Sequence, residues 1–220
     1  PVAATAILGQ LFNASDLAVV GNFAGEARTA AVAAVGANSS VVSLVVNLFT
    51  GVALGANVVI AGAIGREDTD SAQRAVHTAL LFAVLGGFVI ALVGELAAEP
   101  LLRMMSVPDE VLPLALLYLR IYLIGMPVIL LYNFEAAIFR SIGDTKVPLA
   151  TLAISGVINV ILNLFFVIVL GMTVDGVAIA TVISNAISAV ILFFRLRKAN
   201  DYIRLDISKL HINMRSLRHI

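Results

Sequence analysis

The sequence predicts an all-α membrane protein with six transmembrane helices. Its residues are 60% hydrophobic and 13% charged, whereas soluble domains average about 45–50% and about 25%. The mean hydropathy is +1.03, and apolar stretches of a length that crosses a bilayer recur along the chain. The 14 basic and 14 acidic residues balance, so no excess charge points to a nucleic-acid partner. The absence of cysteine excludes disulfides and thiolate metal sites.

Each predicted helix is a run of about 20 or more mostly apolar residues. The expected ranges are 1–20, 35–64, 75–96, 112–139, 147–170 and 177–196. The second and fourth are long enough to tilt or to extend beyond the bilayer. Within the fourth, Gly125-Met126-Pro127 predicts a kink, because proline removes a backbone hydrogen bond. Short connections between the runs predict antiparallel neighbours.

The connections contain helix-end signals. Asp70, with Gln73 three residues later, resembles a capping box at the start of the third helix. Ser106 is a possible cap ahead of the fourth helix, where Pro108 and two acids follow. Gly143 predicts a helix end, and Asp144 or Thr145 then predicts the next cap.

The basic residues predict the orientation, because cytoplasmic connections are enriched in Lys and Arg. Eleven of the 14 follow the second, fourth or sixth helix: Arg66, Arg74, Arg140, Lys146, Arg195, Arg197, Lys198, Arg204, Lys209, Arg215 and Arg218. Only Arg28 and Arg103 fall on the opposite side, and Arg120 lies within the fourth helix. We therefore expect a multi-pass protein of the cytoplasmic membrane with both ends of the chain in the cytoplasm.

Residues 199–220 differ from the rest of the chain. Ile207, Leu210, Met214 and Leu217 recur at helical spacing with basic residues between them. This pattern is typical of an amphipathic segment on the cytoplasmic membrane surface, and a soluble linker is the alternative. Because the chain begins at Pro1 inside an apolar run, we expect a fragment that lacks the start of its first helix.

Asp16 is the most informative polar residue. A carboxylate within a spanning helix is costly and commonly faces a bundle interior or a water-filled cavity. Asn13 lies one turn earlier on the same helix face, so we expect it beside the same cavity. An aspartate at the membrane interface, near the helix end at Gly21, is the alternative interpretation.

Three more polar residues lie in the fifth and sixth helices. Asn159 and Asn163 are four residues apart and share a helix face, and Thr181 follows in the next helix. Bonds between helices would explain them equally well. Together with Asp16, they would supply the hard oxygen ligands that suit an alkali cation. The carboxylate alone, removed from water, could instead carry a proton.

Other polar residues predict less. We expect Glu135 to form an ion pair with Arg140 or to reach the interface, and Arg120 has no acidic partner in its own helix. The histidines, His77, His211 and His219, are dispersed and do not predict a metal site. The sequence has no Walker A motif, no G-x-S-x-G and no H-E-x-x-H. A transporter, driven by an ion gradient, is therefore favoured over an enzyme, and no cofactor is expected.

These motifs together resemble the multidrug and toxic compound extrusion (MATE) family along essentially the whole chain. The segments that carry the resemblance are NASDLAVVG (13–21), GANVVIAGAIGRED (55–68), YLRIYLIGMP (118–127), FRSIGDTKVP (139–148), NVILN (159–163) and DGVAIAT (175–181). The resemblance implies one six-helix N-terminal lobe, residues 1–198, of a twelve-helix transporter. Residues 199–220 would lead toward the C-terminal lobe.

The resemblance also implies a function. MATE transporters export cationic or amphipathic organic compounds in exchange for H⁺ or Na⁺, while two lobes alternate around a central cavity. Asp16, Asn159, Asn163 and Thr181 match the family's cation-site positions. Some members have aspartate where this chain has Asn163, which weakens the case for sodium and leaves the proton open. The alternatives are a lipid-linked oligosaccharide flippase of the same superfamily, a non-transporting scaffold or a membrane-embedded enzyme.

Overall fold

A computed structural model describes residues 2–206, with the backbone alone for residues 2–6 and Gln10. This part of the chain is helical and contains no strand. Its α-helices are α1 (Val2–Phe23), α2 (Arg28–Gly65), α3 (Thr69–Met104), α4 (Leu112–Ile124), α5 (Met126–Ser141), α6 (Lys146–Leu164) and α7 (Val174–Arg197). A 3₁₀ turn, η1 (Gly25–Ala27), precedes α2, and a π-helical turn, η2 (Phe165–Val169), continues α6.

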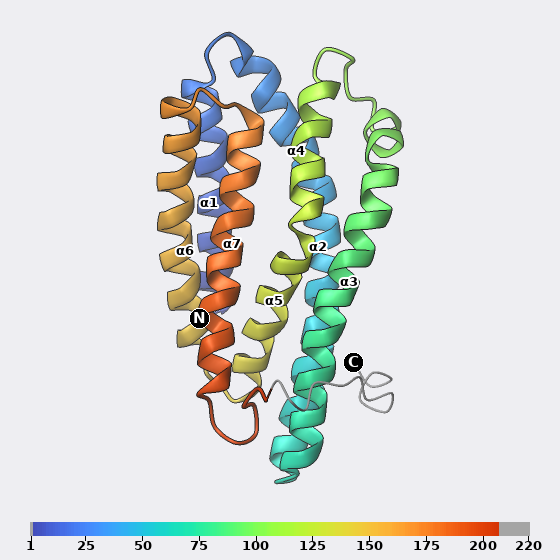
Figure 1. The fold of residues 1–220 in the computed structure, drawn as a ribbon, viewed down its shortest axis with the longest axis vertical. Helices are drawn as coiled ribbons and strands as arrows, with labels where there is room; N and C mark the ends of the chain where they lie inside the picture. The colour runs from blue at the N-terminus through green and yellow to red at the C-terminus, as the bar shows by residue number, and fades with distance from the viewer. Residues whose placement is uncertain (1, 207–220) are drawn as a thin grey trace.

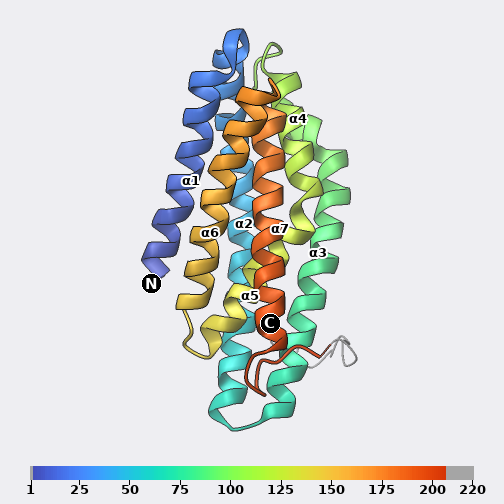
Figure 2. The same ribbon diagram turned by 60° about the vertical axis from the view of Figure 1, so that its left-hand side comes forward.

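The helices form one bundle of antiparallel neighbours (Figures 1 and 2). The α2–α3 and α5–α6 connections and the C-terminal end of α7 lie at one pole of the bundle (Figure 1). The α1–α2, α3–α4 and α6–α7 connections lie at the other pole (Figure 1). This arrangement agrees with the predicted alternation of the helices. The basic connections therefore share one pole, which we call the basic pole.

Four helices of the described chain are long and apolar enough to cross a membrane: α2, α3, α6 with η2, and α7. The pair α4 and α5 makes a fifth span if it is counted as one helix bent by 52°. The helix α1 is not among these spans, although it packs along α6 and α2 in the same bundle. The chain is thus a multi-pass membrane protein.

The bend between α4 and α5 confirms the predicted kink and is held by close packing. A Cβ added to Gly87 on α3 would lie 2.3 Å from the Pro127 Cα, so the two backbones nearly touch. On the other side, a Cβ added to Gly125 would lie 2.4 Å from the Val182 side chain on α7. The bend is therefore fitted between α3 and α7, and only glycine fits at either contact.

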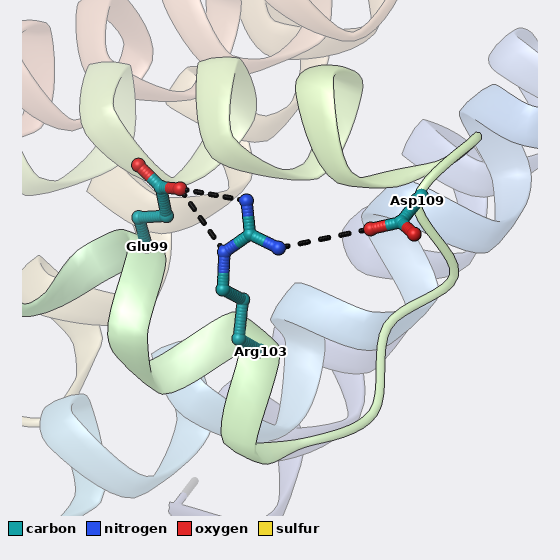
Figure 3. Close-up of polar contacts among 3 residues, drawn as sticks. All are labelled: Glu99, Arg103 and Asp109. Carbon is teal, nitrogen blue, oxygen red and sulfur yellow. Dashed lines mark hydrogen bonds and ion pairs between the residues drawn. The ribbon is translucent and has the colours of Figure 1, made fainter.

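Polar contacts occur at two of the connections. The Asp68 side chain accepts a hydrogen bond from the Ser71 backbone N–H at 2.9 Å, so Asp68 caps α3 and the predicted role of Asp70 was wrong. At the other pole, Arg103 bonds Glu99 at 2.9 Å and lies 3.7 Å from Asp109 across the α3–α4 connection (Figure 3). Ser106, the predicted cap, has a positive φ of 58° and lies within this connection. The helix α4 begins only at Leu112.

The segment after α7 folds back onto the bundle. Ile203 and Leu205 are buried, and the Leu205 N–H donates to the Leu196 carbonyl at 3.1 Å. The Asp206 N–H donates to Nε2 of His77 on α3 at 3.2 Å. The residues of the predicted amphipathic pattern, from Ile207 onward, lie outside the described part of the chain.

Candidate functional site

A polar cavity of about 320 Å³ opens between α1, α2, α4, α6 and α7. Its polar side chains are amides, hydroxyls and one carboxylate: Asn13, Asp16, Ser39, Ser43, Asn47, Tyr118, Tyr122, Ser155, Asn159, Thr181, Ser184 and Asn185. Asp16 is the only charged side chain that lines it among the residues the structure describes. The cavity therefore provides a polar chamber with one ionisable carboxyl group inside an otherwise apolar bundle.

Three of the four predicted cation-site residues, Asp16, Asn159 and Thr181, line this cavity, and the fourth, Asn163, is fully buried beside them. Asn163 on α6 donates its side-chain amide to Oδ1 of Asp16 on α1 and, at 3.2 Å, to Oδ1 of Asn159. Asn159 in turn donates to Oγ1 of Thr181 on α7 at 3.3 Å. The sequence could not show that α1, α6 and α7 bring these groups into one network.

Close packing of α1 on α6 makes this network possible. A Cβ added to Gly156 would lie 1.7 Å from the Phe12 ring, so glycine leaves the room in which that ring sits. Phe12 is one turn before Asp16, and Gly156 is one turn before Asn159. The same contact therefore sets the distance between the two polar faces.

The Thr181 hydroxyl has two acceptors within reach but only one proton to donate. Its Oγ1 lies 3.0 Å from the Val177 carbonyl and 3.4 Å from Oδ2 of Asp16, and a hydroxyl donates only one proton. The shorter bond goes to the helix backbone. Oδ2 of Asp16 is therefore the less satisfied of the two carboxylate oxygens and the natural position for an added proton or cation.

One further oxygen in the network has no partner. Oδ1 of Asn163 is buried and accepts no hydrogen bond, although buried polar atoms are nearly always paired. Asn163 is fully buried and Asp16 is 6% exposed. An unsatisfied buried amide oxygen would be relieved by a hydrogen-bond donor or by a small cation, since oxygen atoms of this type are cation ligands.

Much of the cavity wall was not predicted from the sequence. Ser39, Ser43 and Asn47 follow each other at four-residue spacing along α2, a signal that was available. Tyr118 and Tyr122 stack with ring centroids 6.1 Å apart. The sequence does not indicate that these two tyrosines line a cavity, because tyrosines at helical spacing also occur in ordinary hydrophobic cores.

Two charged residues that the sequence singled out lie outside the cavity. Arg120 pairs with Glu95 of α3, its Nε lying 3.5 Å from Oε2. Glu135 on α5 is completely buried, and neither of its carboxylate oxygens has a hydrogen-bond partner. Both predicted alternatives for Glu135, an ion pair with Arg140 and a position at the interface, were therefore wrong: the two residues are five positions apart, and α5 turns Glu135 into the bundle.

Comparisons with known proteins agree with this architecture. The chain is 33% identical over 182 residues to the probable multidrug resistance protein YoeA of Bacillus subtilis, covering 80% of this chain and 39% of that protein. It is 26% identical over 206 residues to an FAD transporter of Shewanella oneidensis, covering 90% of this chain and 45% of that protein. The chain thus spans less than half the length of these relatives.

A solved structure described as MATE in the bent conformation shares the fold. It superposes with a TM-score of 0.89 over 98% of this chain and 47% of its own, at 24% sequence identity. The described helices therefore have the arrangement of one lobe of a two-lobe transporter. The family model MatE matches residues 1–165, and the chain belongs to this family, that of the MATE transporters.

Proposed function

We propose that this chain is one lobe of a cation-coupled exporter in the cytoplasmic membrane, with the basic pole in the cytoplasm. The observation that carries the proposal is the position of Asp16. It is the only charged side chain lining the polar cavity in the described chain, and it is bonded to Asn163 and close to Thr181. H⁺ or Na⁺ would bind there in exchange for an organic substrate.

A proton and a sodium ion would be bound by different atoms of this network. A proton on Oδ2 of Asp16 could be donated to Oγ1 of Thr181, which would keep its own bond to the Val177 carbonyl. A sodium ion would use the carboxylate together with amide and hydroxyl oxygens of Asn163, Asn159 and Thr181. To drive transport, the ion must bind the two arrangements of the lobes with different affinities.

The cavity favours an organic cation or a neutral amphipathic compound as substrate. Asp16 supplies a negative charge, and the stacked rings of Tyr118 and Tyr122 supply aromatic faces, which attract cations. The FAD transporter among the relatives handles an anionic cofactor. In this chain no Lys or Arg lines the cavity in the described part, so electrostatics disfavour a phosphate-bearing substrate here.

The same observation weighs against the flippase alternative. A lipid-linked oligosaccharide carries phosphates, which basic residues in the cavity would bind. Arg120, the basic residue inside a predicted span, pairs with Glu95 away from the cavity. A scaffold would not need a carboxylate in a water-accessible chamber.

The test uses the full-length transporter that contains this lobe, reconstituted in proteoliposomes. Export of a fluorescent organic cation is recorded under an imposed proton gradient and, separately, an imposed sodium gradient. Asp16→Asn keeps the shape of the side chain and removes its charge, so gradient-driven export should fall to the protein-free level. Glu135→Gln is the matched control, because it removes another buried carboxyl outside the cavity.

The outcomes separate the proposals. Export driven by one gradient, lost in Asp16→Asn and retained in Glu135→Gln, would support antiport and identify the ion. Equal export by wild type and Asp16→Asn would remove Asp16 from the coupling site. A folded protein that exports no cation under either gradient would favour the scaffold or flippase.

A further inference from the structure

A second groove, of about 610 Å³, lies at the basic pole between α5, α6 and α7. It is separate from the cavity, and the two share no lining residue. The groove lies where α5 ends, α6 begins and α7 ends. These three helix ends lie together at one end of the bundle (Figures 1 and 2). Such a position, at the ends of spanning helices, is where lipid headgroups meet a membrane protein.

The walls of this groove are apolar and partly exposed. They consist of Phe139, Ile142 and Val147 on one side and of Val190, Ile191 and Phe194 on α7. Val190 is 54% exposed and Phe194 is 55% exposed. Their exposed faces continue along a spanning helix, which gives an acyl chain an apolar surface directly below the rim.

The rim is basic. Arg195 and Lys198 line the groove, and the ion pairs of the described chain include neither of them. Asp144 also lies there, but its Oδ1 accepts the N–H groups of Lys146 and Val147 at 3.0 and 3.1 Å. That carboxylate is engaged as the cap of α6, so two basic side chains face one acidic one.

We propose that this groove binds an acidic phospholipid. Arg195 and Lys198 would hold the phosphate, and the apolar walls with Phe194 would hold the first part of an acyl chain. A guanidinium and an ammonium both bind phosphate well, and basic pockets between spanning helices at the cytoplasmic side suit anionic headgroups. The chain's own residues 207–220 are a poor occupant, since Lys209, Arg215 and Arg218 would meet a basic rim.

The test measures lipid binding and is independent of transport. The full-length protein in detergent is titrated with phosphatidylglycerol or phosphatidylethanolamine, and bound lipid is counted by native mass spectrometry. We expect Arg195→Gln and Lys198→Gln to weaken phosphatidylglycerol binding by about fivefold each and by about 30-fold together. Arg197→Gln is the matched control: Arg197 is equally close to the end of α7 and exposed but does not line the groove.

A preference for phosphatidylglycerol that disappears in the double variant and persists in Arg197→Gln would support the site. Equal binding of the two lipids, or an equal loss in Arg197→Gln, would overturn it. An excess of glycerol 3-phosphate is added in a further titration. Complete displacement of the lipid would show that the rim binds a free phosphate ester and would also overturn the proposal.

Discussion

The side-chain amide of Asn163 donates to the carboxylate of Asp16 from a position 147 residues away in the chain. This bond joins α6 to α1 at the wall of the cavity. The same amide donates to Asn159 at 3.2 Å, so Asn163 sits between the carboxylate and the next polar side chain. Its own oxygen remains without a partner.

Replacement of Asn163 by alanine should weaken the coupling-ion response. The variant loses the donor that orients Asp16 together with the free amide oxygen, and hydrogen-bond partners that orient an ion's ligands commonly contribute about 10- to 100-fold in affinity. The half-saturating ion concentration for export should therefore rise by about tenfold or more. Asn133→Ala is the control, because the Asn133 amide bonds only the Ile129 carbonyl of its own helix in the described chain. An unchanged ion response in Asn163→Ala would exclude Asn163 from the site.

Gly87→Ala should destabilise the lobe, because its Cβ would overlap the backbone of Pro127 at 2.3 Å. Overpacking of this kind costs about 1–3 kcal/mol. Gly86→Ala is the control, since its Cβ would meet only the Phe49 ring, at 3.7 Å, and alanine favours a helix over glycine by about 1 kcal/mol. Thermal unfolding in detergent should show a lower Tm for Gly87→Ala and an equal or higher Tm for Gly86→Ala. The opposite order would mean that the bend is not tightly packed.

Glu135→Met should stabilise the protein. Both carboxylate oxygens are buried without partners, and leaving a buried polar group unsatisfied costs about 1–3 kcal/mol. Methionine fills a similar volume without that cost, whereas Glu135→Gln keeps an unpartnered polar group and should gain little. The two variants are compared by thermal unfolding. A lower Tm for Glu135→Met would reveal a polar partner, such as a water molecule, at this position.

The Asp68 cap should make stability depend on pH. Hydrogen bonds from Ser71 lower the pKa of Asp68 below its ordinary value of 3.8. The ionised carboxylate is therefore favoured in the folded state, so its contribution is complete above pH 3.8 and is lost as the pH falls further, through the folded-state pKa.

Asp68→Asn keeps a good cap and removes this titration. The stability difference between wild type and Asp68→Asn should be constant near neutral pH and should change only below about pH 4. Asp70→Asn, two residues later, is the control and should leave that acid-range change in place. If Asp70→Asn abolished it instead, Asp70 would be the titrating cap.

The sequence predicted five of the six spans, α2, α3, the bent pair α4–α5, α6 with η2, and α7, because each of these apolar runs is long enough to cross a bilayer; the predicted first span, α1, is not among the helices that meet this criterion in the described chain. The bend at Gly125-Met126-Pro127 was equally readable, since it depends on local backbone chemistry. Helix ends were less predictable. The helix α3 runs from Thr69 to Met104, well beyond the expected 75–96, because its backbone bonds continue through the polar residues on both sides of the apolar run.

The features that the sequence did not predict depend on contacts between helices. Nothing near Arg120 in the chain indicates Glu95, which lies on another helix, and nothing near Glu135 indicates that α5 turns it into the core. The cation-site residues were selected by their polarity within apolar runs, the resemblance added the family's cation-site positions, and their roles remain predictions. Their meeting depends on the approach of α1 to α6 at Gly156, a contact that no local pattern encodes.

The fold-back of the chain after α7 has a mechanical consequence. Leu205 is bonded to the end of α7, and Asp206 is bonded to His77 on α3. A pull on the chain beyond residue 206 is therefore shared by two helices and does not act on the last turn of α7 alone. Displacement of that chain would therefore load the end of α7 and the start of α3 together.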